Sequence, residues 1–312
     1  MELKYNIPKY VAMTRMSGKV RVLVEGKDDR GHVLNLLQQV YPKVKLRVDS
    51  AVEINGDCNL TKMNNRAKIE KIHGQCKLGS FHRKLFFLCD REFRNFDVGV
   101  IVVDTHGEHE SDGNLSWTLG HSIENYFLSP IMLGEGFRYL STSGFKSQAV
   151  TLFCSVFADA IRKIAALTLA AKELGCANYP ASQIAWPAID LNEGCVTFDR
   201  GEGLNAFQLR FWAVFDKYIG VVDKSEEVVC SRLCRGHTAV LVLQRIFSAC
   251  LYDVSRSTDE EVARYDANLF NNVGEVNISS ALSEAWIRQV TAGVGDALYP
   301  VPLVQSICAV SA

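Results

Sequence analysis

Apolar runs that alternate with helical patterns organise the first 130 residues. A short strand is predicted at residues 21–24, and Gly26 then permits a sharp turn because it lacks a Cβ atom. Apolar residues recur at helical spacing from Val33 to Val40, which predicts a helix directly after the turn. Further predictions are strands at residues 44–48, 84–89 and 98–103, a loop over residues 51–60 and a helix at residues 62–73. Strands alternating with helices favour a mostly parallel sheet flanked by helices.

The pattern becomes helical beyond Pro130. Residues 146–174 form one long helical pattern, and apolar or aromatic residues repeat at helical spacing over 207–218 and 240–247. Thr258 to Glu261 resembles a capping box that opens another helix, and a last helix is expected at residues 280–290. Residues 176–205 read as an irregular connection. We therefore predict an α/β domain over residues 1–135 and a mainly α-helical domain over residues 136–312.

Charge is distributed unevenly although the formal net charge is only −1. Residues 1–95 carry 19 Lys and Arg against 10 Asp and Glu, and the remainder carries 15 against 25. A basic front part that also holds acidic clusters suits a metal-dependent enzyme acting on a polyanion, or is a dipolar surface without further meaning. Lys62 and Arg66 lie on one predicted helix and, with Lys27 and Arg91 beside the acids, are candidates for nucleic-acid contacts; a solvated face is the alternative.

The ten cysteines follow no disulfide framework, and the N-terminal residues do not resemble a signal peptide. The longest apolar helical pattern, residues 150–174, is interrupted by charges, so no membrane span is expected. These features favour a reducing, cytoplasmic location. Cys230, Cys234 and His237 have ligand-like spacing but lack a fourth ligand, so core packing is the favoured interpretation over zinc.

Acidic residues end three separate apolar segments. Glu25 and Asp29 follow the first strand, Asp90 and Glu92 follow the strand at residues 84–89, and Glu124 lies within an apolar stretch where an unpaired carboxylate would be costly. Carboxylates that meet at the carboxyl edge of a parallel sheet suit Mg²⁺ or Mn²⁺. Two such ions about 4 Å apart would hold the attacking and leaving oxygens of a phosphodiester displacement.

Other interpretations of these acids stay open. Asp29 also suits a helix-start acid without chemistry, and the strand-end acids also fit a phospho-acceptor receiver pocket, although such a pocket needs no Glu124. His106 and His109 share a loop with several acids, but Gly107 and Gly113 in this loop favour an exposed flexible segment over a metal site. The chain lacks a Walker A pattern, which excludes nucleotide hydrolysis by a P-loop.

Three motifs in order carry a family resemblance. Val24-Glu25-Gly26 with Asp29, then Asp90 and Glu92 after an apolar strand, resemble the Toprim catalytic core of primases, topoisomerases and overcoming-lysogenization-defect (OLD) nucleases. The stretch from Ser122 to Phe127 resembles a Toprim subgroup of bacterial anti-phage effectors that includes the AriB-type nuclease subunits of PARIS systems. The resemblance covers roughly residues 20–130 and implies a Toprim-like sheet followed by a helical C-terminal domain.

The resemblance also implies roles for individual residues. Glu25 would be the general acid/base and a metal ligand, and Asp29 a ligand of a second ion. Asp90 and Glu92 would hold the first Mg²⁺, and Glu124 would complete the site. The family's usual Asp-x-Asp is here Asp90-x-Glu92, and the place of a late catalytic lysine is taken by His237, which also suits a helix-start histidine without chemistry.

The function that the resemblance implies is that of a toxin-like endoribonuclease. Such effectors use Mg²⁺ or Mn²⁺, with two ions expected. They cleave host tRNA after release by an ABC-type ATPase partner that senses phage, and they act as homodimers. The residues alone indicate metal-dependent phosphodiester hydrolysis on a polyanion. An OLD-type DNA nuclease and a catalytically inactive partner-binding subunit are the alternative interpretations.

Overall fold

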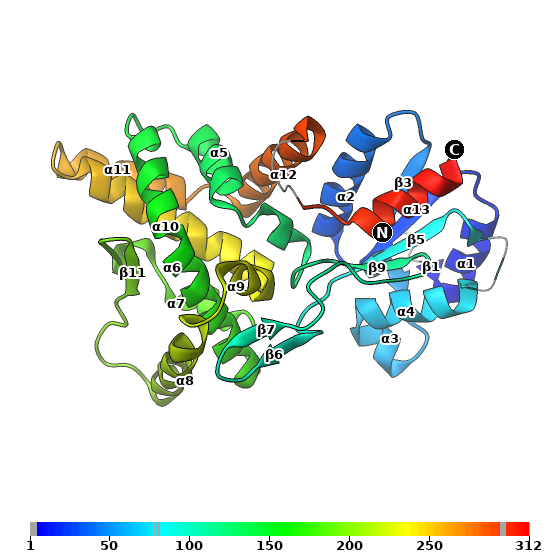
Figure 1. Ribbon diagram of the computed structural model, residues 1–312, viewed down its shortest axis with the longest axis horizontal. Helices are drawn as coiled ribbons and strands as arrows, with labels where there is room; N and C mark the ends of the chain where they lie inside the picture. The colour runs from blue at the N-terminus through cyan, green and yellow to red at the C-terminus, as the bar shows by residue number, and fades with distance from the viewer. Residues whose placement is uncertain (1–4, 78, 80–81, 294–297, 312) are drawn as a thin grey trace. The chain divides into compact units, whose positions relative to one another are not determined.

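The chain folds into two compact units, each assembled from segments that are discontinuous in sequence (Figure 1). The structure is a computed structural model that describes residues 5–77, 79, 82–293 and 298–311. Unit 1 comprises Met1–Arg91, His106–Ile123 and Ile287–Ala312, and unit 2 comprises Glu92–Thr105 and Glu124–Trp286. The units therefore do not follow a single boundary such as the one predicted between residues 135 and 136.

A five-stranded sheet with the order β3-β2-β5-β9-β8 forms the centre of unit 1. Its strands are β2 (Val20–Val24), β3 (Leu46–Ser50), β5 (Leu85–Cys89), β8 (Ser111–Asp112) and β9 (Leu115–Trp117). All neighbouring pairs are parallel except β8 and β9. Every residue of β2 and β5 is buried, which explains why both central strands appear as unbroken rather than alternating apolar runs. The predicted mixed α/β class with a mostly parallel sheet is confirmed.

Helices cover both faces of this sheet (Figure 1). One face packs Leu23 and Phe87 against Tyr10 of α1 (Ile7–Arg15) and Ile72 of α4 (Asn65–Cys76). On the opposite side lie α2 (Lys27–Val40) and the last helix, α13 (Val301–Ser311). Helix α13 contacts β5 and β9, so the end of the chain completes the unit that its beginning starts.

The connection from β3 to β5 is more structured than predicted. The strand predicted at residues 44–48 is displaced by two residues, and the predicted loop over 51–60 contains η1 (Ala51–Glu53) and β4 (Ile54–Asn55), which pairs with β1 (Tyr5–Asn6). The helix predicted at residues 62–73 is two helices, α3 (Asn59–Met63) and α4. Asn64 separates them because its side chain caps α4, accepting a hydrogen bond from the Ala67 amide at 3.0 Å.

The prediction of a strand at residues 98–103 is wrong. β6 (Phe96–Val98) and β7 (Val102–Asp104) form an antiparallel hairpin in unit 2, and the turn between them begins at Gly99. The fourth parallel strand of the sheet is β9 instead, within the segment read from the sequence as a histidine-rich loop. β9 is only three residues long, which is shorter than the run of four to eight residues that signals a strand.

Unit 2 is mostly helical. Its centre is α6 (Lys146–Glu173), the predicted long helix, which packs against α5 (Pro130–Leu140), α8 (Ala206–Val222), α9 (Glu227–Leu233) and α10 (Gly236–Ser255). Helix α11 (Glu260–Asn271) packs on α10, and most of α12 (Glu275–Ala292) belongs to this unit. The residue that caps α11 is Asp259, not the predicted Thr258, and its carboxylate accepts from the Val262 amide at 3.0 Å.

The segment predicted to be irregular, residues 176–205, contains four short elements. They are α7 (Tyr179–Gln183), η4 (Trp186–Ala188) and a hairpin of β10 (Ile189–Asn192) with β11 (Cys195–Phe198). Within the described residues, α10 is the one helix long and apolar enough to cross a membrane, but 72% of its apolar window is buried inside the protein. That burial is typical of a core helix.

Candidate active site at the strand ends of unit 1

Glu25 and Asp90 meet at the carboxyl ends of two adjacent parallel strands. Glu25 follows β2, Asp90 follows β5, and these strands are hydrogen-bonded neighbours. Oε1 of Glu25 accepts a hydrogen bond from the backbone amide of Asp90 at 3.0 Å. The Ser50 hydroxyl, from the end of β3, donates to the Glu25 carbonyl oxygen at 3.3 Å. Three strand ends are therefore linked around Glu25, and the carboxylates of Glu25 and Asp90 are both only partly buried.

Asp29 closes the turn between β2 and α2. Its Oδ2 accepts a hydrogen bond from the backbone amide of Gly26 at 2.6 Å, which is the contact of an N3 residue with its N-cap in a capping box. A Cβ atom on Gly26 would lie only 3.0 Å from that same oxygen, so glycine allows the close approach. The arrangement fits the helix-start alternative for Asp29, since one carboxylate oxygen is already occupied by the cap.

Charged groups of unit 1 gather around the end of β5. Burial raises the pKa of the Cys89 thiol well above its ordinary value, and the negative charges of Glu25, Asp90 and Glu70 raise this pKa further. The positive charge of Arg66 opposes them. Arg66 lies on α4 with 18% of its side chain exposed, and its Nε donates to Glu70 at 3.1 Å. Glu70 was not singled out from the sequence, although its spacing of four residues from Arg66 marks the pair.

The other predicted nucleic-acid contacts differ in accessibility. Lys27 in the first turn of α2 and Lys62 on α3 are exposed. Arg91 is buried: its amide donates to the Thr118 hydroxyl at 2.9 Å, and its guanidinium donates to the Leu119 carbonyl at 2.7 Å. Arg91 thus ties the end of β5 to the segment after β9, which is a structural role within unit 1.

Glu92 has an unusual backbone conformation. It begins the first segment of unit 2, and its φ of 51° lies in the left-handed region that residues with a side chain rarely adopt. The side chain is exposed. A backbone conformation of this kind costs about 1–3 kcal/mol and persists only where the surrounding structure holds it. Such conformations are found most often at functional sites.

The motif around Glu124 is explained largely by packing within unit 2. The motif forms η3 (Ile123–Phe127), where the Asn125 amide donates to the carbonyls of Ser231 at 2.7 Å and Cys234 at 2.9 Å. The rings of Tyr126 and Phe127 pack on the indole of Trp286, at centroid distances of 5.7 and 5.2 Å. Glu124 is partly buried and remains the one residue of the motif for which chemistry is proposed.

The late histidine lies at the start of a helix. His237 is the second residue of α10, its side chain is 53% exposed, and its Nε2 is 4.0 Å from a carboxylate oxygen of Glu275. This position fits the alternative of a helix-start histidine. Cys230 and Cys234 are fully buried, as expected for core packing, and burial raises the pKa of the Cys230 thiol to about 11.

The loop of His106 and His109 belongs to unit 1 and leads into the hairpin of β8 and β9. His106 is exposed, and Asp112 of β8 pairs with Lys77 at 2.6 Å. The loop thus has a structural explanation as the approach to the edge strand.

The carboxylates of Glu25 and Asp90 are oxygen donors of the type that Mg²⁺ prefers, but two carboxylates do not by themselves complete its coordination. In the part of the chain that the structure describes, no three His, Cys, Asp or Glu side chains are grouped so that they could hold a metal ion. Mg²⁺ usually keeps several waters and is held by one or two carboxylates together with substrate phosphates. Glu25 and Asp90, two oxygen donors at adjoining strand ends, fit that pattern.

No protein-family model matches this sequence, and no curated protein matches it.

Proposed function

We propose that the protein is a Mg²⁺-dependent endonuclease of the Toprim type that hydrolyses phosphodiester bonds. The observation that carries the proposal is the contact between Glu25 and the strand end at Asp90, at the carboxyl edge of a parallel sheet. Ligands of open α/β folds bind at this edge. The motif resemblance supports the same assignment for Glu92 and Glu124, which enter the proposal from the sequence alone.

Within this proposal the residues have distinct tasks. Glu25 and Asp90 would hold the ion, whose chemistry when bound is to neutralise phosphate charge and lower the pKa of a bound water. Glu25 would also act as the general acid/base. Its residue is only partly buried, so its carboxylate can exchange a proton with a substrate or with water. Arg66 lies within electrostatic range of the same strand end and would offset the negative charge of a phosphodiester.

The substrate and partners of the proposal follow the family resemblance. RNA, with host tRNA favoured, is the proposed substrate, and an ABC-type ATPase is the proposed controlling partner of a homodimeric, toxin-like anti-phage effector. The excess of basic residues over residues 1–95 supports a polyanionic substrate. An OLD-type DNA nuclease uses the same carboxylates, so assays on tRNA and plasmid DNA in parallel distinguish the two.

The test is the substitution Glu25→Gln. Glutamine keeps an oxygen that can accept the Asp90 amide hydrogen bond, so the turn is preserved while the charge is removed. We expect Mg²⁺-dependent cleavage and growth toxicity to be lost, with an unchanged melting temperature. Glu108→Gln, an exposed carboxylate of the same unit, is the matched control and should keep full activity. Undiminished cleavage by Glu25→Gln contradicts the proposal, and binding of an ATPase without any cleavage by the wild type favours an inactive partner-binding subunit.

A further inference from the structure

Six exposed cations of unit 1 have no carboxylate partner among the described residues. They belong to three segments of the chain, residues 5–24, 41–48 and 77–89, and none of these segments contains an Asp or Glu except outside its limits. The six cations are Lys9, Lys19, Lys43, Lys45, Arg83 and Lys84. Positive charge is therefore concentrated in these segments without being neutralised locally.

The three segments meet at the amino-terminal edge of the sheet. Lys45 precedes β3, Lys19 precedes β2 and Lys84 precedes β5, and these strands are neighbours in the order β3-β2-β5. The Val20 amide donates to the Lys45 carbonyl at 3.0 Å, and the Arg21 amide donates to the Lys84 carbonyl at 2.8 Å. Because neighbouring strands lie about 4.8 Å apart, the backbones of the three lysines follow one another along this edge.

Two open pockets lie beside the same edge. Lys19 and Lys45 border a pocket of about 660 Å³, and Lys9 and Arg21 border one of about 480 Å³. No described Asp or Glu lines either pocket. The cations are thus accessible, and the surface around them carries no opposing carboxylate.

The fold itself accounts for only part of this charge. Asp49, the one Asp or Glu within β2, β3 and β5, is buried and already accepts from Arg21 and Arg47, each at 2.7 Å. Helices α2 and α4 end shortly before β3 and β5, so their C-termini lie toward this edge. Each helix terminus is equivalent to about half a negative charge, which leaves most of the six positive charges unbalanced.

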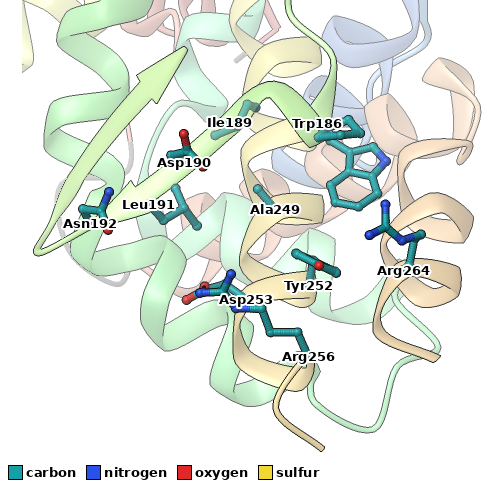
Figure 2. A pocket seen from close by; sticks show the side chains of 11 residues that line it. Trp186, Ile189, Asp190, Leu191, Asn192, Ala249, Tyr252, Asp253, Arg256 and Arg264 are labelled. Atoms are coloured by element: carbon teal, nitrogen blue, oxygen red, sulfur yellow. Dashed lines mark ion pairs between the residues drawn. The ribbon is translucent and has the colours of Figure 1, made fainter. Parts of the chain in front are cut away.

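The cavity of about 330 Å³ beside β10 in unit 2 shows the contrasting arrangement (Figure 2). Its two arginines are already paired, Arg256 with Asp253 at 2.8 Å and Arg264 with Glu260 at 3.1 Å. Asp190 also lines this cavity. Charges of both signs therefore offset one another there, so it offers little net attraction for an anion.

We propose that the starts of β3, β2 and β5 form a second nucleic-acid surface, which holds the phosphate backbone of RNA away from the cleaved bond. Cations separated by less than the Debye length of about 8 Å repel one another, and phosphates relieve this repulsion and release counterions when they bind. The choice of RNA rests on the proposed function, whereas the anionic class of the partner follows from the charges.

This surface is distinct from the candidate active site. Lys19 and Glu25 are six residues apart at opposite ends of β2, which corresponds to about 20 Å at ~3.3 Å per residue. A dinucleotide bound at Glu25 is too short to reach Lys19, but a longer RNA can contact both. The surface would therefore favour long substrates over short ones.

A lipid surface matches this edge less well than RNA does. A membrane-binding face combines its cations with several apolar side chains that insert between lipids. Among the described residues of the three segments, Met16 is the one large apolar side chain that is strongly exposed. A row of cations with little apolar surface fits a phosphate backbone instead.

The first experiment measures fluorescence anisotropy of a labelled 20-nucleotide polyuridine RNA in EDTA. The protein carries Glu25→Gln, so that binding is measured without cleavage. We expect the further double substitution Lys19→Gln with Lys45→Gln to weaken binding about 20-fold at about 0.1 M salt. The slope of log affinity against log salt should become shallower by about 1.4, because about 0.7 is lost per phosphate contact of a single strand.

The matched control removes two exposed lysines of unit 2, Lys217→Gln with Lys224→Gln, and should bind RNA like its parent. All variants should keep the melting temperature of the parent. Equal weakening by the control, unchanged binding in the Lys19 and Lys45 variant, or no RNA binding at all overturns the proposal. Loss of binding to phosphatidylserine vesicles with unchanged RNA binding would identify a lipid surface and overturn it as well.

The second experiment measures cleavage with Glu25 intact. For the 20-nucleotide RNA, the Lys19 and Lys45 variant should raise KM about 20-fold and leave kcat unchanged; for a dinucleotide it should change neither. Equal changes for both substrates would place these lysines at the cleaved bond and contradict a separate surface. If the wild type cleaves neither RNA, the nuclease proposal fails, and the anisotropy measurement alone decides whether this surface binds RNA.

Discussion

Asp90 in unit 1 and Asn125 in unit 2 are both polar residues within or beside apolar segments, yet their surroundings differ. The side-chain amide of Asn125 donates hydrogen bonds to carbonyl groups at the end of α9. It therefore satisfies backbone acceptors that have no partner within the helix. At Asp90 the contact with Glu25 is made by the backbone amide, so the fold does not need the Asp90 carboxylate for this contact. A polar side chain at a strand end is therefore a stronger candidate for chemistry when the local fold is held by its backbone.

The largest effect is expected from Asp90→Asn. Because the Glu25 contact uses the Asp90 amide, the strand ends should keep their arrangement while one ligand charge is lost. We expect Mg²⁺-dependent cleavage to fall by at least about 100-fold, equivalent to ~3 kcal/mol of transition-state stabilisation. Asp97→Asn, an exposed aspartate beyond the strand end, should cleave normally. Wild-type rates in Asp90→Asn, measured over a Mg²⁺ titration, would remove Asp90 from the site.

Asn125→Ala is expected to lower stability, whereas Asp90→Asn is expected to lower activity and leave the fold intact. Alanine leaves the carbonyls of Ser231 and Cys234 without their donor, which should lower the free energy of unfolding by about 2 kcal/mol. Urea denaturation monitored by circular dichroism measures this loss. The exposed Asn277→Ala on α12 should change stability little. An unaltered urea midpoint for Asn125→Ala would show that the hydrogen bonds of this side chain do not stabilise the fold.

A smaller effect is expected at Asp29, for which helix capping and metal ligation are the alternative roles. Asp29→Ala removes the acceptor of the Gly26 amide and should lower the free energy of unfolding by about 1 kcal/mol. Asp29→Asn keeps an oxygen that can accept the same hydrogen bond, so we expect it to retain the stability and the cleavage of the wild type. Stability retained without cleavage would instead identify the Asp29 carboxylate as a metal ligand.

The smallest effect is a pH dependence of unit 1. Burial lowers the pKa of His73 below its ordinary value, and its ring lies edge-on to Phe87 at 5.4 Å. The unfolded chain therefore binds a proton more readily, so this contribution to stability is complete above about pH 6.5 and is lost as the pH falls through and below that value. His73→Leu should flatten the decline in melting temperature between about pH 7 and pH 5. An equally steep decline in the variant would assign it to other groups.

The sequence predicts the elements that are long and continuously patterned. β2, β5, α2 and α6 are found where predicted, because five buried strand residues or several helical turns give an unambiguous signal. β9 was missed because it has three residues, and the strand predicted at residues 98–103 was wrong because a turn at Gly99 folds that segment back on itself.

The candidate site was partly predictable for a similar reason. Parallel strands place their carboxyl ends together, so the meeting of Glu25 and Asp90, 65 residues apart, follows from two correct strand predictions. The partners of Asn125 lie more than 100 residues away in a helix terminus, and no local pattern announces them. The burial of Arg91 was equally hidden, because its carbonyl partner at Leu119 is reached only through the unpredicted strand β9.

Helix α13 has a consequence for the way the protein is made. Leu303 and Ile307 of this helix are fully buried, and the Val304 carbonyl accepts a hydrogen bond from the Tyr41 hydroxyl across 263 residues of chain. During translation the strands β2 and β5 emerge long before α13. The side of the sheet that α13 covers can therefore be buried only after α13 has been synthesised, and contacts of such long range close slowly. A chain that stops before α13 lacks these buried contacts of unit 1.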